Sequence, residues 1–165
     1  MKHASAKKAL MIWGMGNPLH RDDGAGVRAA ELLRERLREK TECEVRICET
    51  QPENFLGLLR KNPPEMLLIC DASDMGLPPG SLRRFTPLEM AQENWSTHGY
   101  PLERLLEPFL DSLSIFCLGI QPECTELGTE LSPSVARGVE ELVSLIEGNR
   151  WYEIPLLSKE EASTS

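Results

Sequence analysis

Short apolar segments of strand length constrain the fold of this chain more than any other feature of its sequence. They are Ala9–Met15, Met66–Asp71 and Ser114–Ile120. Met66–Asp71 is nearly continuous in its apolar character, which is typical of a central parallel strand that is covered on both faces. Segments with helical spacing lie between these runs, and this alternation predicts an α/β sandwich around a mostly parallel sheet.

The remaining elements follow from periodicity and from helix start and stop signals. Val27, Ala30, Leu33 and Leu37 are spaced as on one face of a helix over Gly24–Arg38. The other predicted helices are Glu53–Arg60, Leu102–Leu110 with a possible break at Pro108, and a helix with Ser132 as N-cap and Pro133 at its first position, running to Ile146 and stopping at Gly148. The other predicted strands are Glu44–Cys48 and Ser81–Phe85, and a loop at Met75–Gly80 separates Met66–Asp71 from Ser81–Phe85. We therefore expect a three-layer α/β/α sandwich whose twisted sheet has roughly five strands.

Length and charge restrict the domain organisation and the class of partner. The chain has 165 residues, which is the size of one domain, and we expect residues 1–8 and 158–165 to be flexible tails. Its net charge of −8 argues against nucleic acid and anionic membrane as partners. No apolar run approaches the roughly 20 residues that a membrane helix needs, so no membrane insertion is expected. We expect a monomer.

The cysteines indicate a reducing compartment. The chain has five cysteines and no C-x-x-C pair, and Cys48, Cys70 and Cys117 lie inside apolar runs of strand length. Such cysteines are usually buried, reduced thiols. We therefore expect the protein to be cytoplasmic.

Functional groups in parallel sheets gather beyond the carboxyl ends of the strands. That rule selects residues 14–26, 71–76 and 121–123. The first of these segments contains a G-x-G that follows a strand, but the third glycine of a dinucleotide fingerprint is replaced by Leu19. Asp22 and Asp23 then stand where a phosphate would need positive charge. One of them could simply cap the following helix, but one cap suffices, so a further role for the other is expected.

Two more candidates come from the later segments. Asp71 ends an apolar strand, where a carboxylate must be solvated, paired or bound to a cation. His98 lies in a loop just ahead of a helix; His3 and His20 are weaker candidates, although His20 lies in the first loop. Two carboxylates and an imidazole suit nickel, zinc or iron, and three protein ligands leave positions open for a substrate. The sequence has neither the H-E-x-x-H of common zinc proteases nor a G-x-S-x-G elbow.

These motifs resemble those of the hydrogenase maturation endopeptidases. The matching stretches are residues 16–26 (GNPLHRDDGAG), 71–76 (DASDMG), Thr97-His98 and 119–123 (GIQPE), in the order and spacing of that family. The resemblance extends from about Ala9 to Gly148 and is greatest to the subgroup that serves formate-hydrogenlyase (hydrogenase 3 type) hydrogenases. Some family members have glutamate at the position of Asp23.

The resemblance implies an endopeptidase that removes the C-terminal extension of a nickel-loaded nickel-iron hydrogenase large-subunit precursor. It implies that Asp23, Asp71 and His98 are the catalytic residues and the metal contacts, and that they recognise nickel carried by the substrate. Other divalent ions would bind there only weakly. Either an aspartate activating water or a metal-polarised carbonyl would fit. Two alternatives remain open from the residues: a nucleotide- or phosphate-binding α/β domain, and a non-enzymatic chaperone that docks on nickel proteins.

Overall fold

The computed structural model describes residues 7–93 and 101–162 of the chain. In chain order, with η for a 3-10 helix, its elements are β1 (Leu10–Met15), η1 (Arg21–Gly24), α1 (Ala25–Arg36), β2 (Cys43–Glu49), η2 (Pro52–Phe55), α2 (Leu56–Lys61), β3 (Met66–Ala72), β4 (Leu82–Phe85), α3 (Pro87–Glu93), α4 (Leu102–Leu106), η3 (Glu107–Phe109), β5 (Ser114–Ile120), α5 (Pro133–Glu147), η4 (Trp151–Glu153) and α6 (Lys159–Ala162). Within these ranges, no helix combines the length and the apolar character needed to cross a membrane.

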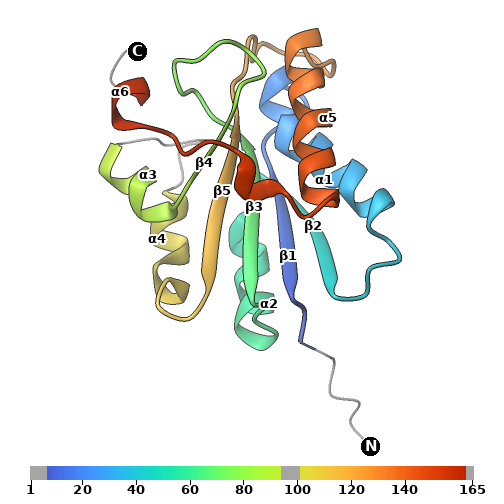
Figure 1. Cartoon of the computed structure of the whole chain (residues 1–165), viewed down its shortest axis with the longest axis vertical. Coiled ribbons are helices and arrows are strands. Elements are labelled where there is room, and N and C mark those ends of the chain that lie inside the picture. The colour runs from blue at the N-terminus through green and yellow to red at the C-terminus, as the bar shows by residue number, and fades with distance from the viewer. Residues whose placement is uncertain (1–6, 94–100, 163–165) are drawn as a thin grey trace, which may run out of the picture.

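The strands form one five-stranded sheet in the order β2-β1-β3-β5-β4. β1 pairs in parallel with β2 and β3, and β3 pairs in parallel with β5. β4 adds to the edge, antiparallel to β5. The predicted mostly parallel sheet is confirmed, and the carboxyl ends of β1, β3 and β5 meet at one edge, which we call the carboxyl edge (Figure 1).

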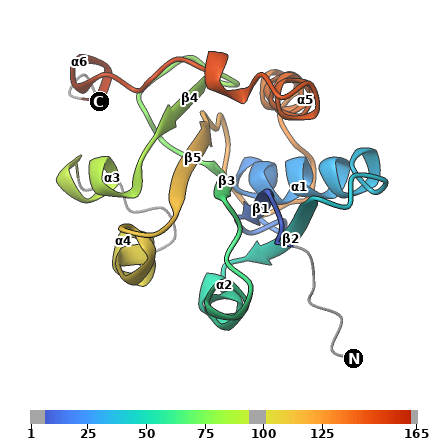
Figure 2. The same ribbon diagram turned by 60° about the horizontal axis from the view of Figure 1, so that its bottom comes forward.

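Helices cover both faces of the sheet (Figure 2). α1 and α5 contribute to one apolar core and α2, α3 and α4 to the other. Residues of β3 alternate between the two cores: Leu68 and Cys70 join the first, whereas Leu67 and Ile69 join the second. This arrangement confirms the three-layer α/β/α sandwich.

Two glycines allow α1 to approach the sheet closely. A Cβ on Gly26 would lie 2.2 Å from the carbonyl oxygen of Cys70, and a Cβ on Gly14 would lie 2.4 Å from the Cβ of Ala30. Neither distance is possible for a real side chain, so only glycine permits this packing. The contact holds the first turn of α1, and η1 before it, against the carboxyl end of β3.

The predicted strands agree with the observed ones to within one residue at each end. The predicted helix at Leu102–Leu110 instead ends at Leu106, and Pro108 lies in the 3-10 helix η3. Proline has no N–H to donate to the preceding turn, which explains the break. The five cysteines are free, and Cys48, Cys70 and Cys117 are buried, as expected.

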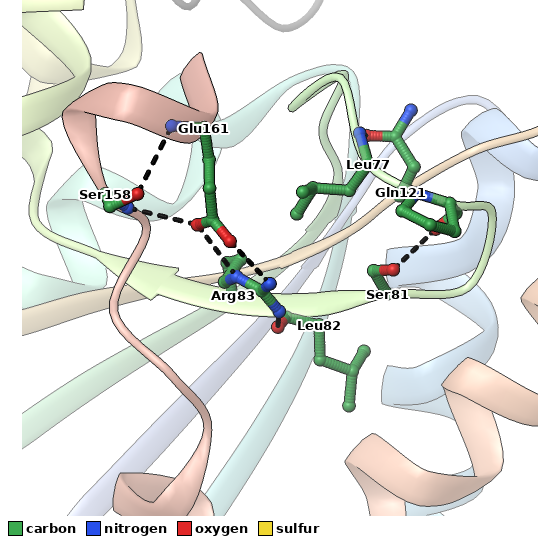
Figure 3. Close-up of polar contacts among 8 residues, drawn as sticks. Leu77, Ser81, Leu82, Arg83, Gln121, Ser158 and Glu161 are labelled. Atoms are coloured by element: carbon green, nitrogen blue, oxygen red, sulfur yellow. Dashed lines mark hydrogen bonds and ion pairs between the residues drawn. The ribbon is translucent and has the colours of Figure 1, made fainter. Parts of the chain in front are cut away.

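The C-terminal segment differs from the flexible tail that we predicted from Ser158. Ser158 and Glu161 form a reciprocal capping box at α6, with backbone N–H to side-chain distances of 3.2 Å in both directions (Figure 3). Glu161 also accepts two hydrogen bonds from Arg83 of β4, at 3.1 and 2.7 Å. Just before this turn, Leu157 N–H donates to the carbonyl of Arg84 at 3.0 Å. The segment therefore lies along the open edge of β4.

Candidate functional site

The carboxyl edge brings together the two predicted carboxylates that lie within the described residues. Asp23 lies in η1, which follows β1, and Asp71 is the penultimate residue of β3. β1 and β3 are hydrogen-bonded neighbours, and η1 contacts β3 directly. The sequence rule that placed both groups at one edge is therefore confirmed in its geometry.

The loop after β1 wraps around Asp23. The backbone N–H of Asn17 donates to Asp23 Oδ2 at 3.1 Å. Gly16 has φ +123°, and a Cβ there would lie 1.9 Å from the carbonyl oxygen of Asp23. The hydrogen bond from Asn17 fixes the carboxylate of Asp23. Because Asp23 is partly exposed, water or a substrate can still reach it.

Asp71 is more deeply placed. It is 5% exposed and pairs in register with Gly119 of β5. Its side chain lines a small recess together with Ile69 and Cys117, on the face covered by α3 and α4. Cys70 belongs to the opposite core, as strand alternation predicts. A buried carboxylate is stable only when polar or cationic groups contact it, which agrees with the predicted role of Asp71 in binding a cation.

Neither thiol beside Asp71 is suited to nucleophilic chemistry. Burial, together with the nearby charge of Asp71, raises the pKa of Cys70 to about 12. The same two causes raise the pKa of Cys117 further. Both groups are therefore protonated at neutral pH, and thiols are poor nucleophiles in that form.

His98 lies outside the described residues. The chain reaches that segment from α3 and leaves it into α4, and Met90 and Leu102 from these helices line the recess that contains Asp71. The described part of the chain contains no group of three His, Cys, Asp or Glu side chains placed to hold a metal ion. His20 is exposed, and its Nδ1 lies 3.2 Å from the carbonyl oxygen of Thr125.

Asp22, the neighbour of Asp23, has a role that the sequence did not predict. It is fully buried, and its Oδ2 accepts hydrogen bonds from the N–H groups of Glu123 and Cys124, each at 2.9 Å. Its Oδ1 accepts from Ser132 N–H at 2.7 Å, and its Oδ2 also accepts from the Ser132 hydroxyl at 2.8 Å. Burial by itself raises the pKa of Asp22, but these four hydrogen bonds outweigh it and leave the pKa below its ordinary value.

The capping predictions need two corrections. Neither Asp22 nor Asp23 caps a helix, because the N-caps of η1 and α1 are His20 and Gly24, without a side-chain hydrogen bond. Ser132 is the N-cap residue of α5 by position, but it makes no side-chain cap. Its hydroxyl donates to Asp22 Oδ2 instead, and the charge of this acceptor strengthens the hydrogen bond.

Gln121 is a second residue whose role was missed. Its Oε1 accepts from the N–H groups of Met75 and Leu77, at 2.7 and 3.2 Å, and its Nε2 donates to Asp74 Oδ1 at 3.1 Å. Figure 3 shows this side chain turned toward Leu77. Gln121 therefore ties the loop after β3 to the end of β5, as Asp22 ties the loop after β5 to η1.

The chain is similar in sequence to proteins of a known family. The sequence model of the HycI family, described as hydrogenase maturation protease, matches residues 27–149. The hydrogenase 3 maturation protease of Escherichia coli K12 is 32% identical over 136 residues, covering 81% of this chain and 86% of that protein. A putative hydrogenase maturation protease of Methanocaldococcus jannaschii is 29% identical over 153 residues, covering 85% of this chain and 89% of that protein.

Solved structures agree with these sequence matches. The crystal structure of the [NiFe] hydrogenase maturation protease HycI from Thermococcus kodakarensis superposes with a TM-score of 0.78 at 30% identity, covering 88% of this chain and 94% of that one. A crystal structure of a hydrogenase 3 maturation protease gives a TM-score of 0.77 at 29% identity, with 94% and 99% covered. These likenesses do not favour the nucleotide-binding alternative.

Proposed function

Because the chain belongs to the hydrogenase maturation protease family, we propose that it removes the C-terminal extension of a nickel-iron hydrogenase large-subunit precursor after nickel has been inserted. The reaction is the hydrolysis of one peptide bond in a folded partner. The expected setting is the cytoplasm, with the protein acting as a monomer.

One observation supports this proposal best: Asp23 and Asp71 come from contacting elements at the carboxyl edge, in unlike surroundings. Asp23 is partly exposed and held by Asn17, whereas Asp71 is almost completely buried. Carboxylates in different environments can divide the work, one contacting the metal and one accepting a proton from the attacking water.

The proposed third member is His98, with Asp23 and Asp71 as the other contacts to the substrate's nickel. Two carboxylates and one imidazole form an open shell with positions left for other ligands. A substrate that already holds nickel would complete this shell, and the shared ion would then position the scissile bond beside the carboxylates. The presence of nickel would thus be checked before cleavage.

The first test removes the proposed contacts one at a time. Asp23→Asn, Asp71→Asn and His98→Ala should each slow precursor processing by at least about a hundredfold, as expected for the loss of a general acid or base. Asp111→Asn is the matched control, because Asp111 is an exposed aspartate outside the carboxyl edge. Processing is followed by the mass shift of the large subunit. Wild-type rates in all three site variants would overturn the assignment.

The second test concerns the nickel. Metal-stripped protein should cleave nickel-loaded precursor and leave nickel-free precursor intact. Equal cleavage of both would contradict recognition of the substrate's nickel, and tight stoichiometric metal in the isolated protein would indicate an ordinary metalloprotease. Binding of the precursor without any cleavage would favour the docking-chaperone alternative. Casein should not be digested, because the proposed substrate is one folded protein.

A further inference from the structure

Two leucines at the carboxyl edge are unusually exposed. Leu19, between β1 and η1, is 59% exposed, and Leu127, between β5 and α5, is 80% exposed. Single exposed leucines are common on soluble proteins and need no explanation. Here, however, the two belong to segments that are bonded to each other although they lie far apart in the sequence.

Backbone hydrogen bonds join the two segments. Gly128 N–H donates to the carbonyl of Leu19 at 2.9 Å, and Arg21 N–H donates to the carbonyl of Gly128 at 2.9 Å. Asp22 N–H donates to the carbonyl of Cys124 at 3.1 Å, and Cys124 N–H donates in return to the buried side chain of Asp22 at 2.9 Å. We call residues 17–21 and 124–128 together the ledge. These hydrogen bonds fix the backbone of the ledge at several points, with both leucine side chains exposed.

The ledge borders the proposed site. The Asn17 side chain accepts from Leu19 N–H at 3.0 Å, while Asn17 N–H donates to Asp23 at 3.1 Å. A hollow of about 360 Å³ opens beside the ledge and is lined in part by Pro18, Arg21, Glu130 and Leu131. A protein resting on the leucines would therefore contact the loop that holds Asp23.

The charge around Leu127 limits the kind of partner. Glu123, Glu126 and Glu130 are all exposed on the same connection between β5 and α5. A partner that covers this connection must offset three carboxylates, so its surface should carry lysine or arginine around an apolar recess.

We propose that the ledge is the docking site for the folded large-subunit precursor, which presents an apolar recess with a basic rim next to its cleavage site. This inference rests on the proposed function, because that function supplies a folded protein that must bind beside Asp23. Leu19 and Leu127 fill the recess, and the glutamates contact the rim.

The test measures binding and processing of nickel-loaded precursor that still carries its C-terminal extension. The double variant Leu19→Ser/Leu127→Ser should raise Kd and KM by at least about tenfold and change kcat by less than about twofold, since it removes anchoring side chains and no reacting group. Leu88→Ser is the matched control, because Leu88 is also 59% exposed but lies on α3. Its Kd and KM should equal those of the wild type. An unchanged Kd in the double variant, or an equal loss in the control, would overturn the proposal.

Charge provides an independent arm. Glu126→Lys/Glu130→Lys should weaken precursor binding at low salt, and added sodium chloride should weaken the binding of the wild type. Tighter binding by the lysine variant would contradict the inference that the precursor has a basic rim. Thermal unfolding of each variant confirms that the fold is intact.

The two proposals can fail separately. If the wild type binds the precursor but does not cleave it, the proposed function fails, while loss of binding in the leucine variant still supports the ledge. If the wild type cleaves and the leucine variant cleaves with unchanged KM, the ledge fails and the proposed function stands.

Discussion

Two carboxylates hold distant segments of this protein together, one inside the carboxyl edge and one at the outer edge of β4. Asp22 is fully buried and accepts hydrogen bonds from the connection between β5 and α5. Glu161 is partly exposed, and it binds Arg83, whose side chain is 20% exposed. When the Glu161 pair separates, both groups can turn to water, whereas the N–H and hydroxyl of Ser132, which donate to Asp22, are buried and have no such alternative. The comparison indicates that burial, and not formal charge pairing, decides which contact the fold depends on.

The pKa values of Asp22 and Glu161 are both lowered from their ordinary values, but for different reasons. The pKa of Asp22 is lowered although burial acts against the charged form, because four hydrogen bonds favour it. The pKa of Glu161 is lowered to about 2, mainly by the hydrogen bonds from Arg83 and then by the N–H of Ser158. A depressed pKa therefore does not by itself rank the two contacts in stability.

The largest effect is expected for Asp22→Ala. The change leaves the N–H groups of Glu123, Cys124 and Ser132 without their acceptor, and the Ser132 N–H and hydroxyl are buried. Each buried donor without an acceptor costs about 1–3 kcal/mol. The free energy of unfolding, measured by urea titration, should fall by at least about 3 kcal/mol. Asp111→Ala, at an exposed position, is the control. A loss below about 0.5 kcal/mol would remove the proposed difference between the two regions.

Asp22→Asn sharpens the comparison through pH. In asparagine an NH2 group replaces one of the two carboxylate oxygens, so N–H groups then face the backbone N–H donors that this oxygen accepted from. The variant should therefore be less stable than the wild type by about 1–3 kcal/mol at neutral pH. Because the folded pKa of Asp22 lies below its ordinary 3.8, its contribution is complete above that value and is lost as the pH falls through the folded pKa. The gap in unfolding free energy between wild type and variant should narrow as the pH falls below 3.8. A constant gap would contradict an ionised Asp22.

Gln121→Met should have an intermediate effect that stays local. The variant keeps the size of the side chain but orphans the N–H groups of Met75 and Leu77, at a cost of about 1–2 kcal/mol. Hydrogen exchange should accelerate at these two amides and remain slow at Cys124, which Asp22 holds. Faster exchange at Cys124 as well would show that the two connections are not independent.

Glu161→Gln should have the smallest effect. It removes the charge that binds Arg83, but both side chains keep access to water. The urea midpoint should match that of the wild type, while trypsin should cleave after Lys159 faster. In 1 M sodium chloride, trypsin should also cleave the wild-type protein faster after Lys159, since salt screens the pair of Arg83 and Glu161. A fall in the midpoint as large as that of Asp22→Asn would reverse the ranking of the two regions.

The sequence by itself determined the strands, the two long helices and the edge where functional groups gather. Local pattern carries this information: apolar runs of strand length, helical spacing at Val27 and Leu33, and Gly148 after the last long helix are each confirmed. The rule that polar groups follow parallel strands then placed Asp23 and Asp71 at one edge. The turn at Ser158–Glu161 also had a local signal, a capping box, but its polar composition resembles that of a frayed tail.

Only the tertiary structure decided how the adjacent aspartates differ. Asp22 and Asp23 are identical in chemistry and neighbours in sequence, yet Asp22 points into donors about a hundred residues away, and Asp23 binds its own loop. The tasks of Gln121 and Ser132 likewise depend on partners that other elements supply. His98 stays a prediction, because the structure does not describe its segment. Local sequence fixes which residues can accept hydrogen bonds, but burial and long-range packing select the donors that they meet.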